Sequence, residues 1–212
     1  ISVIVAVYNT EEYLDRCLES LLNQTYKNME LVIVEDCSTD SSRKLLKKYK
    51  ENENIKIFYN KENRGLSYSR NYGLKKSTGD FIGYIDSDDY VEPDYYEKLM
   101  RSIKDNKSDI AICDIKLVDE QTNKIQRCKC YTNDFDVCSV VNNGFAASAC
   151  NKLFKRKNIE KYPFAEGKVN EDIAVVIPTV IQAKKISYAD TCYYYVQREG
   201  SIQNSRFSNK RF

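Results

Sequence analysis

Short apolar runs alternate with segments of helical spacing over the first 86 residues, and no other feature of the sequence constrains the fold as strongly. The apolar runs are rich in β-branched and aromatic residues and have the length of buried strands: Ser2–Val7, Glu30–Glu35, Ile55–Tyr59 and Phe81–Ile85. The segments between them repeat apolar residues every three or four positions, as helices do. The order βαβαβαβ predicts an α/β fold with a mainly parallel central sheet that helices cover on both faces.

The second half of the chain predicts a smaller, more mixed set of elements. A helix follows Pro93, and two strand-like runs, Asp109–Val118 and Lys124–Tyr131, flank a turn and suggest an antiparallel hairpin. Another helix begins with Glu171 and Asp172, and a tyrosine-rich strand, Lys185–Gln197, follows it. Residues 1–105 and 106–212 are expected to be two halves of one domain, because 212 residues suffice for a single large core.

Three carboxylates follow the fourth predicted strand within four residues: Asp86, Asp88 and Asp89. Asp86 and Asp88 can both turn toward one ligand, and their spacing suits a hydrated divalent cation that carries a phosphorylated substrate. The alternative is a polar turn in which Asp88 or Asp89 caps the next helix. Ligands of parallel sheets bind at the carboxyl ends of the strands, where Tyr8 and Asp36 also fall, so the position favours a binding site.

Composition excludes several classes of function. Lys and Arg total 33 against 31 Asp and Glu, and a net charge of +2 argues against a nucleic-acid partner held by bulk charge. The sequence contains no histidine, which excludes Ser-His-Asp and Cys-His catalysis and leaves acid and base chemistry chiefly to carboxylates. Of the eight cysteines, Cys17 falls on the apolar face of a predicted helix and Cys113 in an apolar strand, which fits a reducing cytoplasm better than a set of disulfides. A zinc site would need Cys113, Cys128, Cys130 and Cys138.

Common phosphate-binding motifs are absent. The first strand-to-helix turn, Val7–Glu11, contains no glycine, so the dinucleotide-binding fingerprint is missing where it would have to be. No Gly-x4-Gly-Lys-Ser/Thr motif occurs either, and Val91 replaces the glycine that a calcium-binding hand starting at Asp86 would require. A phosphorylated ligand at this edge would therefore need a metal bridge.

The opening run, Ile1–Asn9, resembles that of the family 2 glycosyltransferases, which have the nucleotide-sugar-binding fold called GT-A. Five further segments follow in the order typical of that family: Leu31–Asp40, Asn63–Ser67 with Arg70-Asn71, Gly79–Asp89, Asn151–Phe154 and Glu171-Asp172. The tail around Tyr193–Arg198 is similar to that of bacterial capsule and wall-polysaccharide members. This resemblance implies a donor-binding half over residues 1–105 and an acceptor-binding half over 106–212.

The resemblance also implies a nucleotide site. Tyr8 would stack on the base, and Asp36 would accept a hydrogen bond from the uracil imide. Arg70 and Arg198 would add positive charge near the base and pyrophosphate. Alternative interpretations exist for each residue: Tyr8 packing on the following helix, Asp36 capping the second helix as Ser38 could equally do, and the arginines lying on the surface.

Metal ligands are implied by the same resemblance. Asp88 would bind Mn²⁺ or Mg²⁺, which bridges both phosphates of the donor and stabilises the charge on the leaving nucleoside diphosphate. Asp86 would contact the ribose hydroxyls, or the metal through water. Asp89 is expected to be architectural. Glu35 and Cys37 depart from the family, which usually has Asp and Gly at these two positions.

A general base is needed to take the proton of the acceptor hydroxyl, and the position of Asp172 in the family motif implies that role. Its alternative role is a helix cap; Glu166, Glu171 and Asp190 are the other nearby carboxylates. Attack on the face opposite the leaving group implies an inverting transfer. Lys152 is expected to anchor the acceptor or its phosphate.

The expected partners are a nucleotide sugar, with UDP as its nucleotide, and a saccharide or lipid-linked saccharide acceptor. The chain contains no tryptophan and lacks the Gln-x-x-Arg-Trp motif of processive synthases, which indicates single transfers. Residues 206–212 mix basic and aromatic side chains and suggest either contact with the inner face of an anionic membrane or a solvated tail. A nucleotidyltransferase and a catalytically inactive sugar-nucleotide-binding module are the rival interpretations; the first should carry a basic, glycine-rich loop, and the second should lack the carboxylates.

Overall fold

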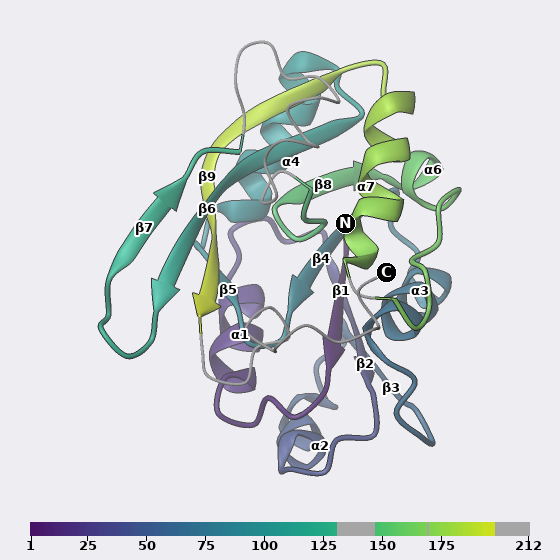
Figure 1. Ribbon diagram of the computed structural model, residues 1–212, viewed down its shortest axis with the longest axis vertical. Helices are drawn as coiled ribbons and strands as arrows, with labels where there is room; N and C mark the ends of the chain where they lie inside the picture. The colour runs from purple at the N-terminus through teal and green to yellow at the C-terminus, as the bar shows by residue number, and fades with distance from the viewer. Residues whose placement is uncertain (131–146, 169, 198–212) are drawn as a thin grey trace.

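One continuous sheet organises the molecule (Figure 1). The computed structural model describes residues 1–130, 147–168 and 170–197. Within these ranges the sheet has nine strands, in the order β3-β2-β1-β4-β8-β6-β9-β5, with β7 pairing with β6. The predicted α/β fold is confirmed.

The first half has the predicted alternation. Strands β1, β2, β3 and β4 pair in parallel, in the order β3-β2-β1-β4. Their bounds are Ser2–Val7, Glu30–Glu35, Ile55–Tyr59 and Phe81–Asp86. The connecting helices are α1 (Leu14–Leu22), α2 (Ser42–Leu45) with the 3-10 helix η1 (Leu46–Tyr49), and α3 (Leu66–Lys76). The second predicted helix is therefore two short turns, and neither Asp36 nor Ser38 caps it, because its N-cap is Ser41.

The second half extends the same sheet with mixed pairing. Its elements are β5 (Tyr90–Val91), α4 (Tyr95–Asn106), β6 (Ile110–Asp119), β7 (Ile125–Cys128), β8 (Lys152–Lys155), α6 (Arg156–Ile159), α7 (Glu171–Gln182) and β9 (Ile186–Gln197). The predicted hairpin is confirmed, since β7 pairs antiparallel with β6, although Tyr131 lies outside the described residues. Strand β8 joins the halves by pairing antiparallel with both β4 and β6.

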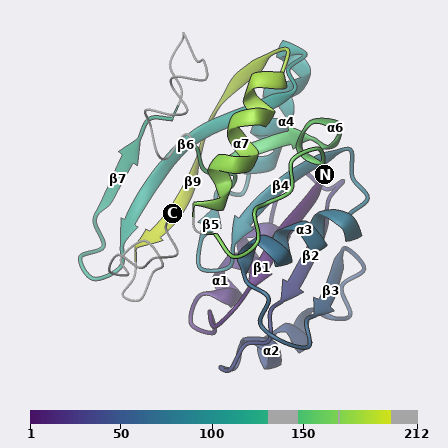
Figure 2. The ribbon, with the colours of Figure 1, turned by 45° about the vertical axis from the view of Figure 1, so that its right-hand side comes forward.

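Helices cover both faces of the sheet, as predicted. Helices α3 and α7 lie in front of it in Figures 1 and 2, and α1 and α4 lie behind. Helix α3 approaches closely because Gly73 has no side chain: a Cβ there would lie 2.5 Å from Cγ2 of Ile4 on β1. No helix within the described ranges is both long and apolar enough to cross a membrane.

Candidate functional site

Three of the predicted site residues follow neighbouring strands at one edge of the sheet. In the parallel register Val7 is opposite Glu35, and Ala6 is opposite Asp86. Tyr8 and Asp36 are the next residues of β1 and β2, so they leave the sheet side by side, with Asp86 at the end of β4 on the other flank of β1. The sequence prediction that these segments converge is confirmed in its topology.

The loops after β1 and β2 are hydrogen-bonded to each other. The amide of Asn9 donates to Oγ of Ser38 at 3.2 Å, and the amide of Thr39 donates to Oδ1 of Asn9 at 2.8 Å. Asn9 has a positive φ of 51°, which turns the chain sharply after Tyr8. Tyr8 is 44% exposed, so it lies outside the core and is accessible to a ligand.

Asp36 is buried and organises the loop before α3. Its Oδ1 accepts from Nδ2 of Asn60 at 2.6 Å and from the amide of Arg64 at 2.9 Å, and its Oδ2 accepts from the amide of Gly65 at 2.7 Å. A carboxylate has about four lone-pair sites, so these three bonds leave room for one further donor. Asp36 thus connects the edge of the sheet to the segment that starts α3.

The neighbours of Asp36 keep the backbone that glycine would favour. Cys37 has a φ of 60° in the left-handed region, although it carries a Cβ. Glu35 is fully buried, and its Oε1 accepts from the amide of Ser38 at 2.5 Å. The two departures from the family pattern therefore leave a turn in which Glu35 bonds to the chain three residues on.

Arg70 connects the acidic strand end to the start of α7. Its Nη2 donates to Oδ1 of Asp86 at 2.7 Å, and its Nη1 donates to Oδ1 of Asp172 at 2.7 Å and to Oε1 of Glu171 at 2.9 Å. The Arg70 side chain is only 3% exposed. Burial alone would lower the pKa of Arg70, but Asp172, Asp86 and Glu171 outweigh it and raise this pKa well above its usual value. The guanidinium is buried among carboxylates, a role that the sequence did not indicate.

The face of α3 that carries Arg70 also fixes the loop before α7. Asn71 and Phe164 exchange two hydrogen bonds of 2.9 Å between the Asn71 side chain and the Phe164 backbone. Ser67 donates to the carbonyl of Ala165 at 2.8 Å. The Phe164 ring lies 5.1 Å from the Arg70 guanidinium and 5.1 Å, edge to face, from the ring of Tyr84. These contacts set the position of the segment that leads to Asp172.

The acidic cluster separates into two kinds of carboxylate. Asp89 is buried; its Oδ1 accepts from the amide of Val196 at 2.8 Å and its Oδ2 from the hydroxyl of Tyr193 at 2.5 Å. Asp89 therefore holds β9, and its expected architectural role is confirmed. Asp86 and Asp88 are half-buried at the strand end.

The carboxylate oxygens of Asp86 and Asp88 at the end of β4 are suitable ligands for a divalent cation. Among the described residues, nothing donates to Oδ2 of Asp86, and no group of three or more Asp, Glu, Cys or His residues surrounds a metal-sized site. Magnesium-like ions are commonly held by one or two carboxylates together with substrate phosphates and water, and the pair Asp86 and Asp88 fits that pattern. Of the cysteines considered for zinc, Cys138 lies outside the described residues.

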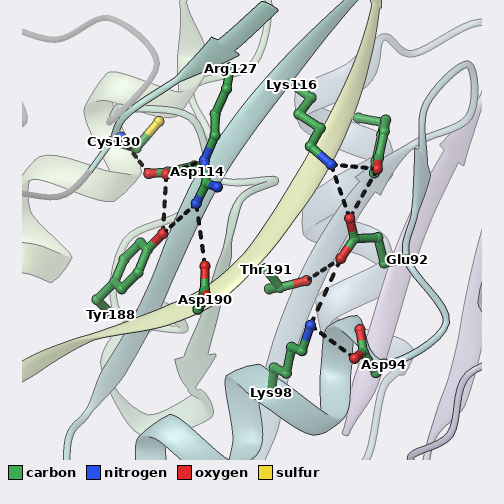
Figure 3. Close-up of polar contacts among 11 residues, drawn as sticks. Glu92, Asp94, Lys98, Asp114, Lys116, Arg127, Cys130, Tyr188, Asp190 and Thr191 are labelled. Carbon is green, nitrogen blue, oxygen red and sulfur yellow. Dashed lines mark hydrogen bonds and ion pairs between the residues drawn. The ribbon is translucent and has the colours of Figure 1, made fainter. Parts of the chain in front are cut away.

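Asp172 is oriented from two sides. Arg70 bonds its Oδ1, and the amide of Ala149 donates to its Oδ2 at 3.1 Å. It makes no side-chain cap bond to α7, whose N-cap is Asn170, and its side chain is 21% exposed. Asp190 points instead toward Arg127 on the far part of the sheet, with an N–O distance of 3.4 Å (Figure 3). Helix α7 therefore presents Asp172 next to the strand end, beside Glu171, which bonds the same guanidinium.

Lys152 and Arg198 are the two remaining residues for which the sequence predicts a role in the site. Lys152 was expected to contact an acceptor, but it is 1% exposed; its Nζ donates to the carbonyl of Ser148 and to Oδ1 of Asn151. The expected anchoring of the acceptor or its phosphate does not fit this burial. Arg198 lies outside the described residues.

Comparison with known proteins agrees with this architecture. The family model described as glycosyl transferase family 2 matches residues 2–163. Glycosyltransferase GlyA of Streptococcus pneumoniae is 36% identical over 95% of this chain, and putative glycosyltransferase EpsH of Bacillus subtilis is 33% identical over 100%. The matched regions cover 31% and 64% of those proteins, so this chain spans only part of their length.

Solved structures show the same fold. S. aureus TarS 1-349 in complex with UDP-GlcNAc has a TM-score of 0.82 and 26% identity, covering 98% of this chain and 61% of that one. The same protein in complex with UDP has a TM-score of 0.80, covering 92% and 60%. GalNAc-T7 has a TM-score of 0.70 at 17% identity and shares the fold over 93% of this chain and 44% of its own.

Proposed function

Because the chain belongs to glycosyl transferase family 2 and has the GT-A fold, we propose that it is an inverting, metal-dependent glycosyltransferase that takes its sugar from a UDP donor. The observation that carries this proposal is the Arg70 cluster, which consists of Arg70, Asp86, Glu171 and Asp172. Two carboxylates more than 80 residues apart, Asp86 and Asp172, bond to one buried guanidinium. The strand end that is proposed to bind the metal and the proposed base therefore both contact the Arg70 side chain.

The nucleotide is proposed to bind over β1 and β2. Tyr8 presents an exposed ring for stacking on the base, and Asp36 offers its remaining lone-pair site to the imide N–H of uracil. UDP and UDP-GlcNAc bound to the similar TarS fold support a uridine nucleotide. Arg198 keeps its predicted role beside the pyrophosphate.

Asp88 and Asp86 are proposed to hold Mn²⁺ or Mg²⁺ together with the donor phosphates. When bound, the ion supplies positive charge for the departing nucleoside diphosphate. Arg70 bonds Oδ1 of Asp86 and holds this carboxylate at the end of β4. The predicted role of Arg70, positive charge near the base and pyrophosphate, is kept here for a guanidinium that bonds three carboxylates.

Asp172 is proposed to take the proton of the acceptor hydroxyl as that hydroxyl attacks the anomeric carbon. Its two oxygens are fixed by Arg70 and by the amide of Ala149, so the lone pairs that remain point in a defined direction. Attack from the side of Asp172, opposite the leaving phosphate, inverts the anomeric configuration.

The acceptor is proposed to be a bacterial surface polysaccharide or a lipid-linked precursor. The similar proteins include the minor teichoic acid biosynthesis protein GgaB of Bacillus subtilis, 30% identical over 94% of this chain, and a poly(ribitol-phosphate) beta-glucosyltransferase of Bacillus spizizenii, 33% identical over 94%. A cytoplasmic protein at the inner face of the membrane would meet such acceptors. Nucleic acid is not an expected partner.

Calorimetric titration with UDP tests the donor site. Wild-type protein should bind UDP at least about tenfold more tightly with Mn²⁺ than with EDTA, and Asp88→Asn should remove that difference. Asp105→Asn, a change at an exposed carboxylate on α4, is the matched control and should preserve it. Equal UDP affinity with and without the ion, or a normal response of the Asp88 variant, would reject the assignment.

A further inference from the structure

The peptide group between Ser148 and Ala149 lies between a buried ammonium and the Asp172 carboxylate. Nζ of Lys152 donates to the carbonyl oxygen of Ser148 at 2.5 Å, and the amide of Ala149 donates to Oδ2 of Asp172 at 3.1 Å. This carbonyl and this amide belong to the same peptide unit. In a trans peptide they point in opposite directions, so Lys152 and Asp172 bond opposite edges of one plane.

We propose that Lys152 is a positioning residue for Asp172, acting through the Ser148–Ala149 peptide. The ammonium fixes the orientation of the peptide plane and draws electron density toward the carbonyl oxygen, which strengthens the hydrogen bond from the Ala149 amide to the carboxylate. Asp172 is thereby held by two cations: Arg70 bonds Oδ1 directly, and Lys152 acts on Oδ2 through the peptide. The inference rests on the proposed role of Asp172 as the general base.

The surroundings of Lys152 attach the peptide to the sheet. Nζ also donates to Oδ1 of Asn151 at 2.8 Å, and Asn151 bonds the backbone of Cys113 on β6 twice, through its Nδ2 at 2.7 Å and its carbonyl at 3.1 Å. These bonds attach the Ser148–Ala149 peptide, and through it Asp172, to the central strand β6. They also restrict rotation of the turn before β8.

Burial makes this use of a lysine unusual. Lys152 is 1% exposed, and burying an ammonium group costs several kcal/mol unless its protons are well bonded. The half-buried Lys155, three residues on, pairs with the Asp109 carboxylate at 2.8 Å, whereas the acceptors of Lys152 within the described ranges are neutral oxygens. An apolar side chain would fill the space at lower cost, so the retained charge points to an effect on the peptide.

The protonation of Lys152 provides a test that needs no substitution. Burial lowers the pKa of Lys152 to about 8, against the opposing influence of Cys130 and Asp172. Burial also raises the pKa of the facing thiols, that of Cys130 to about 11 and those of Cys113 and Cys150 further, so these groups stay neutral while Lys152 titrates. Arg70 stays protonated throughout. Above pH 8 the bond to the Ser148 carbonyl should weaken.

Hydrogen exchange at the Ala149 amide, followed by NMR, tests the inference without any substrate. Lys152→Met should speed this exchange at pH 7 by at least about tenfold, and Lys155→Met, the matched control on the same strand, should leave it unchanged. If Lys152→Met does not fold, the wild-type protein decides: the protection factor of Ala149 should fall with a midpoint near pH 8. Unchanged exchange in a folded variant, or a constant protection factor between pH 7 and 9.5, overturns the proposal.

Turnover distinguishes positioning from packing. With the UDP-sugar that gives the fastest UDP release, Lys152→Met should lower kcat by about 10- to 100-fold and leave KM for the donor within about twofold. In an Asp172→Asn background it should add no further loss, because the carboxylate it positions is gone. Full additivity of the two losses overturns the proposal. If wild type releases no UDP from any sugar, the proposed function fails, and the exchange measurement alone decides the role of Lys152.

Discussion

Replacing Arg70 with methionine should destabilise the fold strongly, because it removes a buried cation that Asp86, Glu171 and Asp172 share. Removing one partner of a buried ion pair typically costs about 3–5 kcal/mol, since the other charge stays buried and unpaired. The carboxylates left behind would also repel one another, which adds to this cost. Partial protonation of these carboxylates limits the combined cost, so we expect the free energy of unfolding to fall by about 3–5 kcal/mol.

Urea denaturation followed by circular dichroism measures this loss of free energy. In thermal denaturation the melting temperature should fall by roughly 6–20 °C, because each kcal/mol lowers it by about 2–4 °C in a chain of this length. Arg156→Met is the matched control, because Arg156 bonds neutral oxygens of Gly79 and Ser77 and should cost only about 1–2 kcal/mol.

The pH dependence separates charge from packing. Burial raises the pKa of Glu171 even with Arg70 present, and loss of the guanidinium raises it further. A carboxyl whose folded-state pKa is raised is tolerated below its unfolded-state pKa, near 4.3, and destabilises as pH rises. The deficit of Arg70→Met should therefore be small near pH 4 and reach its full size by about pH 7. A loss below about 1 kcal/mol at pH 7, or a loss that does not change with pH, would refute the reasoning.

Three further predictions concern residues around the sheet. Burial would raise the pKa of Glu30, but hydrogen bonds from Lys56, Ser2 and Thr78 outweigh it and lower this pKa to about 2. The wild-type protein should therefore lose stability as the pH falls from about 4.5 to 2. Glu30→Gln should lose less stability over that interval, as measured by acid titration followed by fluorescence. Cys37→Gly should raise the free energy of unfolding by roughly 0.5–1 kcal/mol in urea denaturation, because φ there is positive; a clear loss would contradict the assigned backbone. Phe164→Ala should lower the free energy of unfolding by about 3–5 kcal/mol and should also lower kcat, because the ring packs on Arg70. A loss of stability with an unchanged kcat would show that the loop around Phe164 does not position the site.

The parallel half of the fold could be predicted because β1, β2 and β4 are mostly buried and have a nearly continuous apolar signal, and β3, although half-buried, is rich in apolar residues. Strand β5 has two residues and β8 has four, too few for periodicity to mark them, and their pairing partners are 40 or more residues away in the sequence. Single-sequence patterns specify which face of an element is apolar, but they do not name the partner across the sheet.

The site could be predicted in part for the same reason. Parallel strand order alone places Tyr8, Asp36 and Asp86 at one edge. The role of Arg70 could not be predicted, because its bonds to Glu171 and Asp172 join residues 101 and 102 positions apart and depend on how the loop around Phe164 docks on α3. The burial of Lys152 could not be predicted, because lysines rarely lie buried and the local hydrogen bonds that retain it have no sequence signal.

Separate measurement of binding and turnover in Asp172→Asn tests the central claim most directly. UDP affinity in the presence of Mn²⁺ should stay within about threefold of wild type, while transfer from the preferred UDP-sugar should fall by about 10²- to 10⁴-fold, the usual contribution of a general base. Glu166→Gln, at an exposed carboxylate in the loop before α7, should keep both. Transfer by Asp172→Asn within tenfold of wild type would contradict an account in which the Arg70 cluster joins the metal-binding strand end to the catalytic base.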